Sequence, residues 1–358
     1  MTIDQMDQNT TMAAYLARSE RVRGCLVGGA TGDALGWPVE FQGLEAILAA
    51  HGQDGVTELP RRAGRAGSDR LAEVTDDTQM TLFTAEALLW TGGRRSEVRA
   101  AAHAAYQRWL RTQRLSGPEG EQNVGLLGEP WLYASRAPGN ACMSGLRDHP
   151  ELPEVAPFGR VGVVNSNSKG CGTVMRSAPF GLVGVGPEEA FRLSAEAAQL
   201  THGHPTGYVA AGAFAALVDR LVSGEEPSAA VAETIQQAAS APLGAGTETV
   251  EALERAVRLA AEGNAGFDTV ERVGLGWIAE ECLAIAVHCV LAAPADPRRA
   301  LTLSVTHSGD SDSTGAVCGN LLGAAHGLSA LPQDWAAGVE GVPTLLRSAD
   351  LLGALRLA

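Results

Sequence analysis

The chain has 358 residues, of which 45% are hydrophobic and 5% aromatic, and it contains 43 glycines. This length suits one large domain or two average ones, and the scarcity of aromatic residues favours closely packed helices over a β-sandwich. A formal net charge of −14 disfavours binding to nucleic acid or to anionic membranes.

Targeting and redox signals are the first features along the chain. Residues 1–20 are polar and lack the apolar segment of a secretion signal. No apolar run reaches the roughly 18 residues of a transmembrane helix. No CxxC pair is present, so zinc ribbons and thioredoxin-type sites are excluded. We therefore expect a cytoplasmic protein with reduced, mostly buried cysteines, which are Cys25, Cys142, Cys171, Cys282, Cys289 and Cys318.

Apolar residues recur with helical period along most of the chain, and the best strand pattern is the short segment 159–166. No linker separates two self-sufficient halves. We therefore predict an all-α fold, a compact single-domain multi-helix bundle over residues 21–358, preceded by the polar segment 1–20. The predicted helices span 78–91, 97–111, 187–201, 207–223, 227–240, 247–262, 276–292 and 313–328.

A basic, glycine-rich segment, "RRAGRAGSDR" at 61–70, has no apolar anchor. We expect it to be mobile, and its place directly before the first acidic cluster suits a lid.

The first acidic cluster is Thr75-Asp76-Asp77, directly before a predicted helix. One interpretation is an N-cap followed by two acids that the helix dipole favours. The other is a set of oxygen ligands for a cation.

A second cluster favours the cation. Asp310, Asp312 and Ser313 precede another small-residue helix, and oxygens at alternate positions of a turn can face one centre. An EF-hand is excluded, because its last ligand position would hold Leu321. A third acidic element, 28–41, carries Asp33 and Glu40 among glycines. If these elements converge, their carboxylates repel one another unless hard divalent cations, magnesium or manganese, lie between them.

Five segments, in order, resemble the motifs of ADP-ribosylglycohydrolases, over roughly residues 21–328. They are "GCLVGGATGDALGWPVEF", "TDDTQMTLFTAEALL", "SKGCGTVMRSAPFGL", "THGHPTGYVAAGAF" and "HSGDSDSTGAVCGNLLGAAHG". The resemblance implies a compact all-α fold with a binuclear magnesium, or manganese, centre in a cleft. Family members often have Thr where Ser313 stands, and Glu40 matches a glutamate that in some members reaches the metals from a flap. The implied metal ligands are Thr75, Asp76, Asp77, Asp310, Asp312 and Ser313.

The loop 165–176 resembles the segment that holds the diphosphate of ADP-ribose, although an isolated GxG is more often an ordinary turn. Its glycines would allow backbone N–H groups to approach phosphate oxygens. Many relatives have Asn where Cys171 stands. For Arg176 two roles remain open, a phosphate ligand or a buried structural partner. The residues implied to line the ADP-ribose site are Gly170, Cys171, Gly172, Thr173, Met175 and His202.

Several other residues have competing interpretations. His202 and His204 precede Pro205 on a loop that enters a helix, and two residues at this spacing do not share a helix face. For Tyr208 two roles are open: it stacks on the base of the bound ligand, or it packs in the core. Asn140 is expected to be an N-cap. We expect His307 beside the metal ligands rather than among them, and Cys282, His288 and Cys289 within a buried helix.

The resemblance implies hydrolysis of the glycosidic bond between ADP-ribose and a modified acceptor, with arginine favoured among arginine, serine, a nucleobase or a metabolite. A metal-activated water would attack the ribose carbon, and Asp77, Glu40 and Asp312 are the candidate catalytic residues. The expected partner is an ADP-ribosylated protein or conjugate, and the protein is expected to be a monomer. The alternative is an immunity protein that binds ADP-ribose or an ADP-ribosylating toxin with little turnover. Hydrolysis of a sugar phosphate is a further rival that needs no diphosphate loop.

Overall fold

The computed structural model describes residues 3–60, 71–120 and 124–357, with side chains from residue 12 onward. In these ranges the backbone forms sixteen α-helices and several short 3-10 helices, and no β-strand. Two isolated bridges, Ala72 with Val339 and Gly170 with Ile278, are the only β-type pairings of the described residues. The predicted all-α fold is confirmed. No helix in the described part is long and apolar enough to cross a membrane.

The α-helices are α1 (Ile3–Gly36), α2 (Leu44–His51), α3 (Asp76–Trp90), α4 (Val98–Thr112), α5 (Asn140–Asp148), α6 (Ala178–Leu182), α7 (Pro187–Ala198), α8 (Pro205–Val222), α9 (Pro227–Ala239), α10 (Thr247–Ala261), α11 (Phe267–Val273), α12 (Ala279–Ala292), α13 (Pro297–Val305), α14 (Ser311–His326), α15 (Gln333–Ala336) and α16 (Val342–Ala354). The 3-10 helices are η1 (Trp37–Val39), η2 (Arg95–Glu97), η3 (Gly125–Gly128), η4 (Pro130–Leu132), η5 (Cys171–Thr173), η6 (Pro242–Gly244) and η7 (Leu328–Ala330).

The eight helices predicted from apolar periodicity are confirmed as α3, α4, α7, α8, α9, α10, α12 and α14, each within three residues at either end. Several of them begin with proline, as at Pro187, Pro205 and Pro227. Proline is tolerated there because the N–H of the first helical residue has no hydrogen-bond partner within the helix.

The short alternating pattern at 159–166 does not form a strand. Val161 and Val163 are 56% and 61% exposed, and the segment is bonded to Gly203 by two backbone hydrogen bonds, from the Gly162 N–H and to the Asn165 carbonyl. An alternating pattern forms a strand only where a partner strand supplies a ladder of hydrogen bonds, and no described segment does so here.

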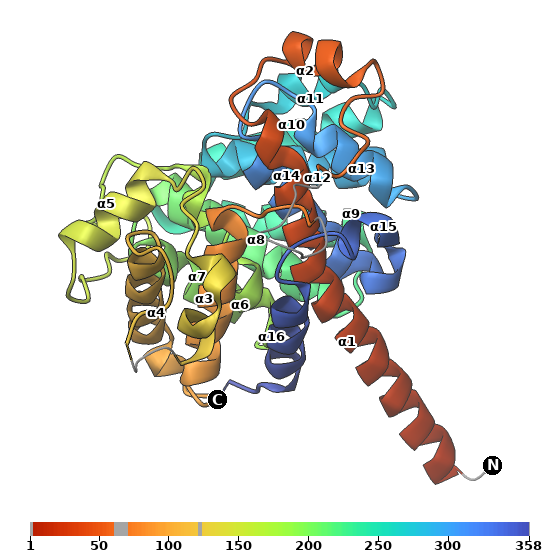
Figure 1. Cartoon of the computed structure of the whole chain (residues 1–358). Helices are drawn as coiled ribbons and strands as arrows, with labels where there is room; N and C mark the ends of the chain where they lie inside the picture. The colour runs from red at the N-terminus through yellow and green to blue at the C-terminus, as the bar shows by residue number, and fades with distance from the viewer. Residues whose placement is uncertain (1–2, 61–70, 121–123, 358) are drawn as a thin grey trace.

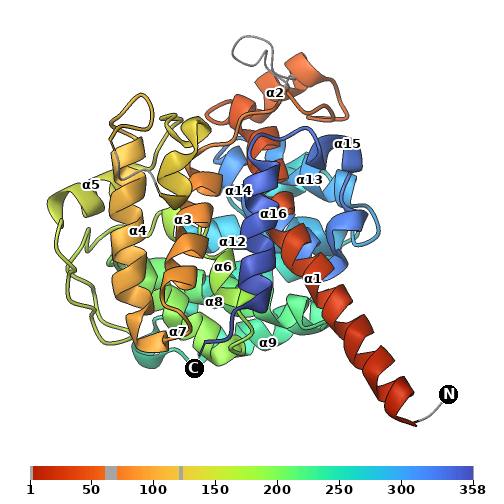
Figure 2. The same ribbon diagram turned by 60° about the horizontal axis from the view of Figure 1, so that its bottom comes forward.

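Helix α1 was not predicted, because its glycines resemble a loop. It runs without a break through residues 20 and 21, so the division of the chain at that point stays a prediction. Its N-terminal turns extend away from the rest of the molecule (Figure 1; Figure 2). The predicted lid at 61–70 lies outside the described residues.

Helices α1 and α14 pack through glycines spaced four residues apart, so that their backbones touch. The facing carbonyls leave no room for a Cβ: at Gly28 it would lie 2.2 Å from the carbonyl oxygen of Gly319, and at Gly36 2.1 Å from that of Ser311. The helices run antiparallel, so the C-terminal end of α1 meets the N-terminal end of α14. This packing brings Glu40 next to the second acidic cluster, while Asp33 contacts the start of α3.

The core surrounds α8, of which almost every residue is buried. Helices α6, α7, α9, α12 and α14 pack against it, and α3 packs against α4 and α6 on one side of the molecule (Figure 2). Small side chains such as Ala211, Ala213 and Ala215 are fully buried on α8, and they permit this close approach of helices.

Candidate active site

One cavity of about 480 Å³ lies where the starts of α3 and α14 meet the loop before η5. This volume is within the range of small-molecule sites, about 300–1000 Å³. The cavity is lined by Glu40, Phe41, Asp76, Asp77, Ala137, Pro138, Gly139, Asn140, Ala141, Cys142, Ser168, Gly170, Cys171, Gly172, Met175, His202, Trp277, Asp310, Asp312 and Ser313.

The first acidic cluster is held by Asp33. Its carboxylate accepts the Thr75 N–H at 3.0 Å and the Thr78 hydroxyl at 2.5 Å, while the Thr75 hydroxyl accepts the Asp77 N–H at 3.3 Å as the N-cap of α3. The donors at the start of α3 are therefore satisfied by Asp33 and Thr75, which leaves Asp76 and Asp77 facing the cavity. Thr75 does both cap the helix and precede the acids, but it does not line the cavity.

The second cluster begins α14. Asp310 is its N-cap, and its Oδ1 accepts the Ser313 N–H at 3.3 Å. The Asp310 N–H donates to the carbonyl of Leu275 at 2.9 Å, which fixes the turn against the loop before α12. Asp312 and Ser313 follow in the first turn and line the cavity with Asp310.

Glu40 joins this second cluster from η1. One oxygen from each of Glu40, Asp310 and Asp312 lies within 4.8 Å of the others. Two buried oxygens, Glu40 Oε2 and Asp77 Oδ2, have no hydrogen-bond partner among the described residues. Buried carboxylate oxygens are nearly always paired, so these two point to a ligand that supplies positive charge.

The electrostatics agree. Burial, and then repulsion from Asp310, raises the pKa of Glu40 to about 8, and burial raises the pKa of Asp76 to about 8. The pKa values of Asp77 and Asp312 are raised well above their usual range, first by burial and then by neighbouring carboxylates. A protein that buries so many acids together pays a large electrostatic cost unless cations neutralise them. The donor set, all oxygen, fits hard divalent cations such as Mg²⁺ or Mn²⁺.

Residues at and around η5 form another wall of the cavity. Gly170, Cys171, Gly172 and Met175 line the cavity, whereas Thr173 is buried with its hydroxyl donating to the Gly207 carbonyl at 2.9 Å. A Cβ on Gly172 would lie 2.7 Å from Cys142 Sγ, so glycine is required there. The Cys171 N–H donates to the Trp277 carbonyl at 3.2 Å, and its thiol donates to Asp310 Oδ2 at 2.7 Å. Cys171 thus links the loop to the acidic cluster.

His202 belongs to this wall, and Arg176 lies behind it. His202 lines the cavity, and its Nδ1 lies 2.7 Å from the Thr201 hydroxyl; burial, and then Arg176, lowers its pKa to about 3, so the ring is neutral. Arg176 is buried, donates to Thr201 Oγ1 at 2.6 Å, and lies over the Tyr106 ring at 4.7 Å. It does not line the cavity, and its contacts fit a structural role.

His204 and Tyr208 have structural contacts. His204 is the N-cap of α8 and accepts the Thr206 N–H, as its place before Pro205 predicts. Tyr208 is fully buried, and its hydroxyl accepts the Gly159 N–H and donates to the Arg160 carbonyl. It is a core residue and does not line the cavity.

The predicted N-cap Asn140 is wrong. Helix α5 begins at Asn140 with Gly139 as its N-cap, and the Gly139 N–H donates to Asp76 at 3.2 Å. Asn140 lines the cavity instead. His307 is buried and contacts Thr314 Oγ1 at 2.9 Å, which places it behind the second cluster. Cys282, His288 and Cys289 are buried in α12, as predicted.

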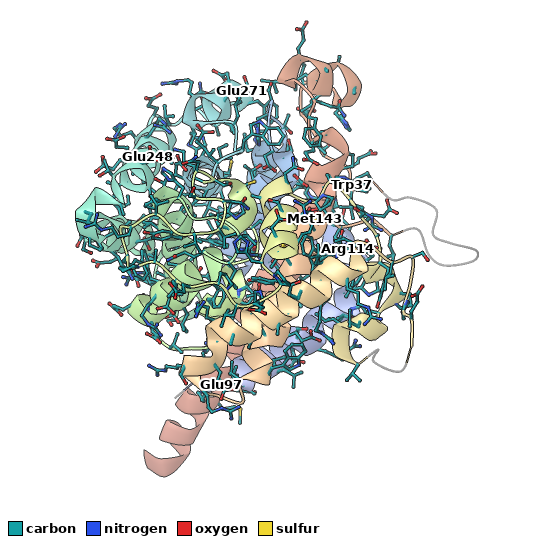
Figure 3. All side chains as sticks on the ribbon, turned by 90° about the vertical axis from the view of Figure 1, so that its left-hand side faces the viewer. Trp37, Glu97, Arg114, Met143, Glu248 and Glu271 are labelled. Carbon is teal, nitrogen blue, oxygen red and sulfur yellow. The ribbon has the colours of Figure 1, made fainter. Side chains whose placement is uncertain are left out.

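Sequence reasoning missed Phe41, Trp277 and the segment 137–142 as lining residues. Figure 3 views the side of the molecule on which α5 lies, with Met143 of that helix near the centre. A weak signal existed for Phe41, since it adjoins Glu40. None existed for Trp277, which lies far from every acidic motif in the sequence.

The comparisons with known proteins bear on this site. The family model for ADP-ribosylglycohydrolase matches residues 14–357. The chain belongs to the ADP-ribosylglycohydrolase family. At the level of the family, this membership supports hydrolysis of ADP-ribose conjugates.

Its relatives are distant but cover nearly its whole length. The chain is 28% identical to the uncharacterized protein YegU of Escherichia coli, over 92% of this chain and 94% of that one. It is 26% identical to ADP-ribosylhydrolase ARH3 of Bos taurus, over 92% and 91%. It is 24% identical to ADP-ribosyl-[dinitrogen reductase] glycohydrolase of Rhodospirillum rubrum, over 88% and 89%.

A solved structure titled ADP-ribosylglycohydrolase-related protein complex matches with a TM-score of 0.59 and 22% identity, over 95% of this chain and 99% of that one. At this identity the match concerns the fold alone, and it agrees with the predicted bundle.

Proposed function

We propose that this protein is a metal-dependent hydrolase that releases ADP-ribose from a modified acceptor, with ADP-ribosyl-arginine in a protein as the favoured substrate. The observation that carries the proposal is the meeting of two acidic helix starts, 233 residues apart from Asp77 to Asp310, at one cavity that the glycine loop at 170–172 also lines. A sugar-phosphate hydrolase would not need that loop.

Asp76, Asp77, Asp310, Asp312, Ser313 and, from the rim, Glu40 would hold two Mg²⁺ or Mn²⁺ ions, with Thr75 as a further candidate. When bound, such ions offset the negative charge of the site and act as Lewis acids toward the ribose hydroxyls and water. Their positive charge would also allow a protein with a formal net charge of −14 to bind a negatively charged diphosphate.

The chain's own residues position the reacting groups. The Cys171 N–H is already used by the Trp277 carbonyl, so Gly170 and Gly172, which line the cavity, would offer their backbone N–H groups to the diphosphate. Neutral His202 lines the same cavity. Asp77 Oδ2 and Glu40 Oε2, which lack protein partners, are the candidates for moving a proton from the attacking water or to the departing acceptor. Asp312, which lies near Glu40 in the cluster, would orient that water.

The retained acidic cluster favours the enzyme over an immunity or binding protein, because an unneutralised cluster would destabilise the fold. The test is incubation with ADP-ribosylated arginine protein and magnesium, with and without EDTA. Release of free ADP-ribose only with metal is the expected result. Tight ADP-ribose binding without release in either condition would instead support the binding protein, possible partners then including an ADP-ribosylating toxin.

A further inference from the structure

Two aromatic rings from distant parts of the sequence stack at the rim of the cavity. Phe41 follows Glu40, and Trp277 precedes α12; both line the cavity. Their ring centroids lie 5.3 Å apart at an interplanar angle of 23°. The side chains nevertheless remain 70% and 39% exposed. Large apolar rings left exposed together beside a pocket mark a surface that a ligand covers.

The backbone holds Trp277 at this position. Its carbonyl accepts the Cys171 N–H, and two residues earlier the carbonyl of Leu275 accepts the Asp310 N–H. Gly276 between them has a φ of +82°, and a Cβ there would lie 2.6 Å from Thr314 Cγ2. The backbone that carries the indole is therefore fixed to both the glycine loop and the start of α14.

Phe41 is held in an unusual conformation. Its φ is +66°, in the left-handed region that residues other than glycine seldom adopt. The same turn directs the carboxylate of Glu40 toward Asp310 and Asp312. Adjacent residues therefore place two different groups: the Phe41 ring lies at the rim of the cavity, and the Glu40 carboxylate lies in the acidic cluster.

The aromatic pair and a neighbouring groove border the cavity at different residues. The aromatic pair lines it together with Glu40 and Asp310. The cavity shares Asn140, Ala141 and Ser168 with an open groove of about 730 Å³, whose lining includes the neutral polar side chains of Asn165 and Asn167. Phe41 directly follows Glu40, so a cationic acceptor group that covers the rings would also lie beside a carboxylate, which attracts it.

We infer that Phe41 and Trp277 form a platform on which the guanidinium group of an ADP-ribosylated arginine stacks, and that this platform selects arginine acceptors over neutral ones. The inference rests on the proposed function. A guanidinium is planar and weakly hydrated, so it stacks well on aromatic faces. The fold already uses this contact elsewhere, since Arg298 lies over the Trp335 ring at 4.2 Å from its centroid.

The test compares two substrates that share ADP-ribose and differ in the acceptor, an arginine-linked and a serine-linked peptide, with magnesium present. For Trp277→Ala, the ratio of kcat/KM for arginine to that for serine should fall by about 3- to 30-fold, the range of a lost cation–π contact. The change should appear mainly in KM for the arginine conjugate. Phe41→Leu should act in the same direction, and Trp277→Phe should restore most of the ratio.

The matched control is Trp90→Ala. Trp90 is 44% exposed at the end of α3 and does not line the cavity, so the ratio should keep its wild-type value. Equal losses on both conjugates in Trp277→Ala, with the wild type active, would overturn the platform and leave the proposed function standing. A wild type that releases ADP-ribose from neither conjugate would overturn both.

Discussion

Gly32 of α1 lies directly against the backbone of Gly315 of α14, so closely that a Cβ on Gly32 would be 1.9 Å from the Gly315 carbonyl oxygen. This contact places the C-terminal end of α1 against the start of α14. Asp33 lies in the last turns of α1, and Glu40 follows shortly after the helix ends. The position of the acidic cluster therefore depends on Gly32 and Gly315 having no side chain, although neither glycine lines the cavity.

Gly32→Ala should force the two helices apart. We expect a loss of about 2–4 kcal/mol in the free energy of unfolding, as for other overpacked or strained core sites, and a weaker magnesium response. Urea denaturation measures the first and a thermal shift with magnesium the second. Gly353→Ala is the control, because its Cβ would meet its nearest neighbour only at 4.0 Å, and alanine in a helix should stabilise slightly. Equal stability of both variants would contradict close packing.

Replacement of a cluster acid should separate stability from activity. Asp77→Asn and Asp312→Asn should each abolish release of ADP-ribose, while the metal-free protein becomes no less stable, because each change removes a buried charge from a repulsive group. Circular dichroism and a turnover assay report the two properties. The control is Asp219→Asn, another buried acid that does not line the cavity. Near-normal turnover in both cluster variants would remove the assigned site.

Metal-free stability should depend on pH in a defined direction. The folded state raises the pKa values of Glu40 and Asp76 to about 8, so it holds their protons more tightly than the unfolded chain does. This contribution is fully present below the unfolded pKa values, near 4, and is lost as the pH rises toward about 8.

Magnesium should consequently stabilise the protein more at pH 8 than at pH 5. Binding to the folded state alone contributes about 2.7 kcal/mol when the ion is 100-fold above its Kd, and protons compete with it at the lower pH. Differential scanning calorimetry with magnesium or EDTA at the two pH values provides the measurement. A larger magnesium shift at pH 5 would contradict the cation site.

Arg176 should prove structural. Arg176→Met keeps much of the volume but removes the hydrogen bond to Thr201 and the contact with Cys142 Sγ at 3.2 Å. We expect a loss of about 2–4 kcal/mol in the free energy of unfolding. The Kd for ADP-ribose, from isothermal titration calorimetry, should change far less than loss of a phosphate contact would cause. A large rise in Kd at unchanged stability would instead assign Arg176 to the phosphate.

Local sequence signals located much of the framework. Apolar periodicity, proline at first helical positions and the acidic pairs at 76–77 and 310–312 are properties of a few neighbouring residues, so they place eight helices and both acidic clusters. The same signals failed for α1, because its glycines satisfy a packing contact with α14 that lies some 300 residues away and disfavour a helix when read alone. The alternating pattern at 159–166 forms no strand, because a strand needs a distant partner.

The sequence by itself determined which side chains are available to the site, because the motifs consist of residues that are neighbours in the chain. The tertiary structure alone decided which of them meet: Glu40 with Asp310 and Asp312, Phe41 with Trp277, and Thr75 and Thr173 away from the cavity. The reason is physical. A helix forms from interactions within about four residues, whereas the convergence of groups from distant helices depends on how their faces pack, and here that packing depends on backbones that touch at glycine.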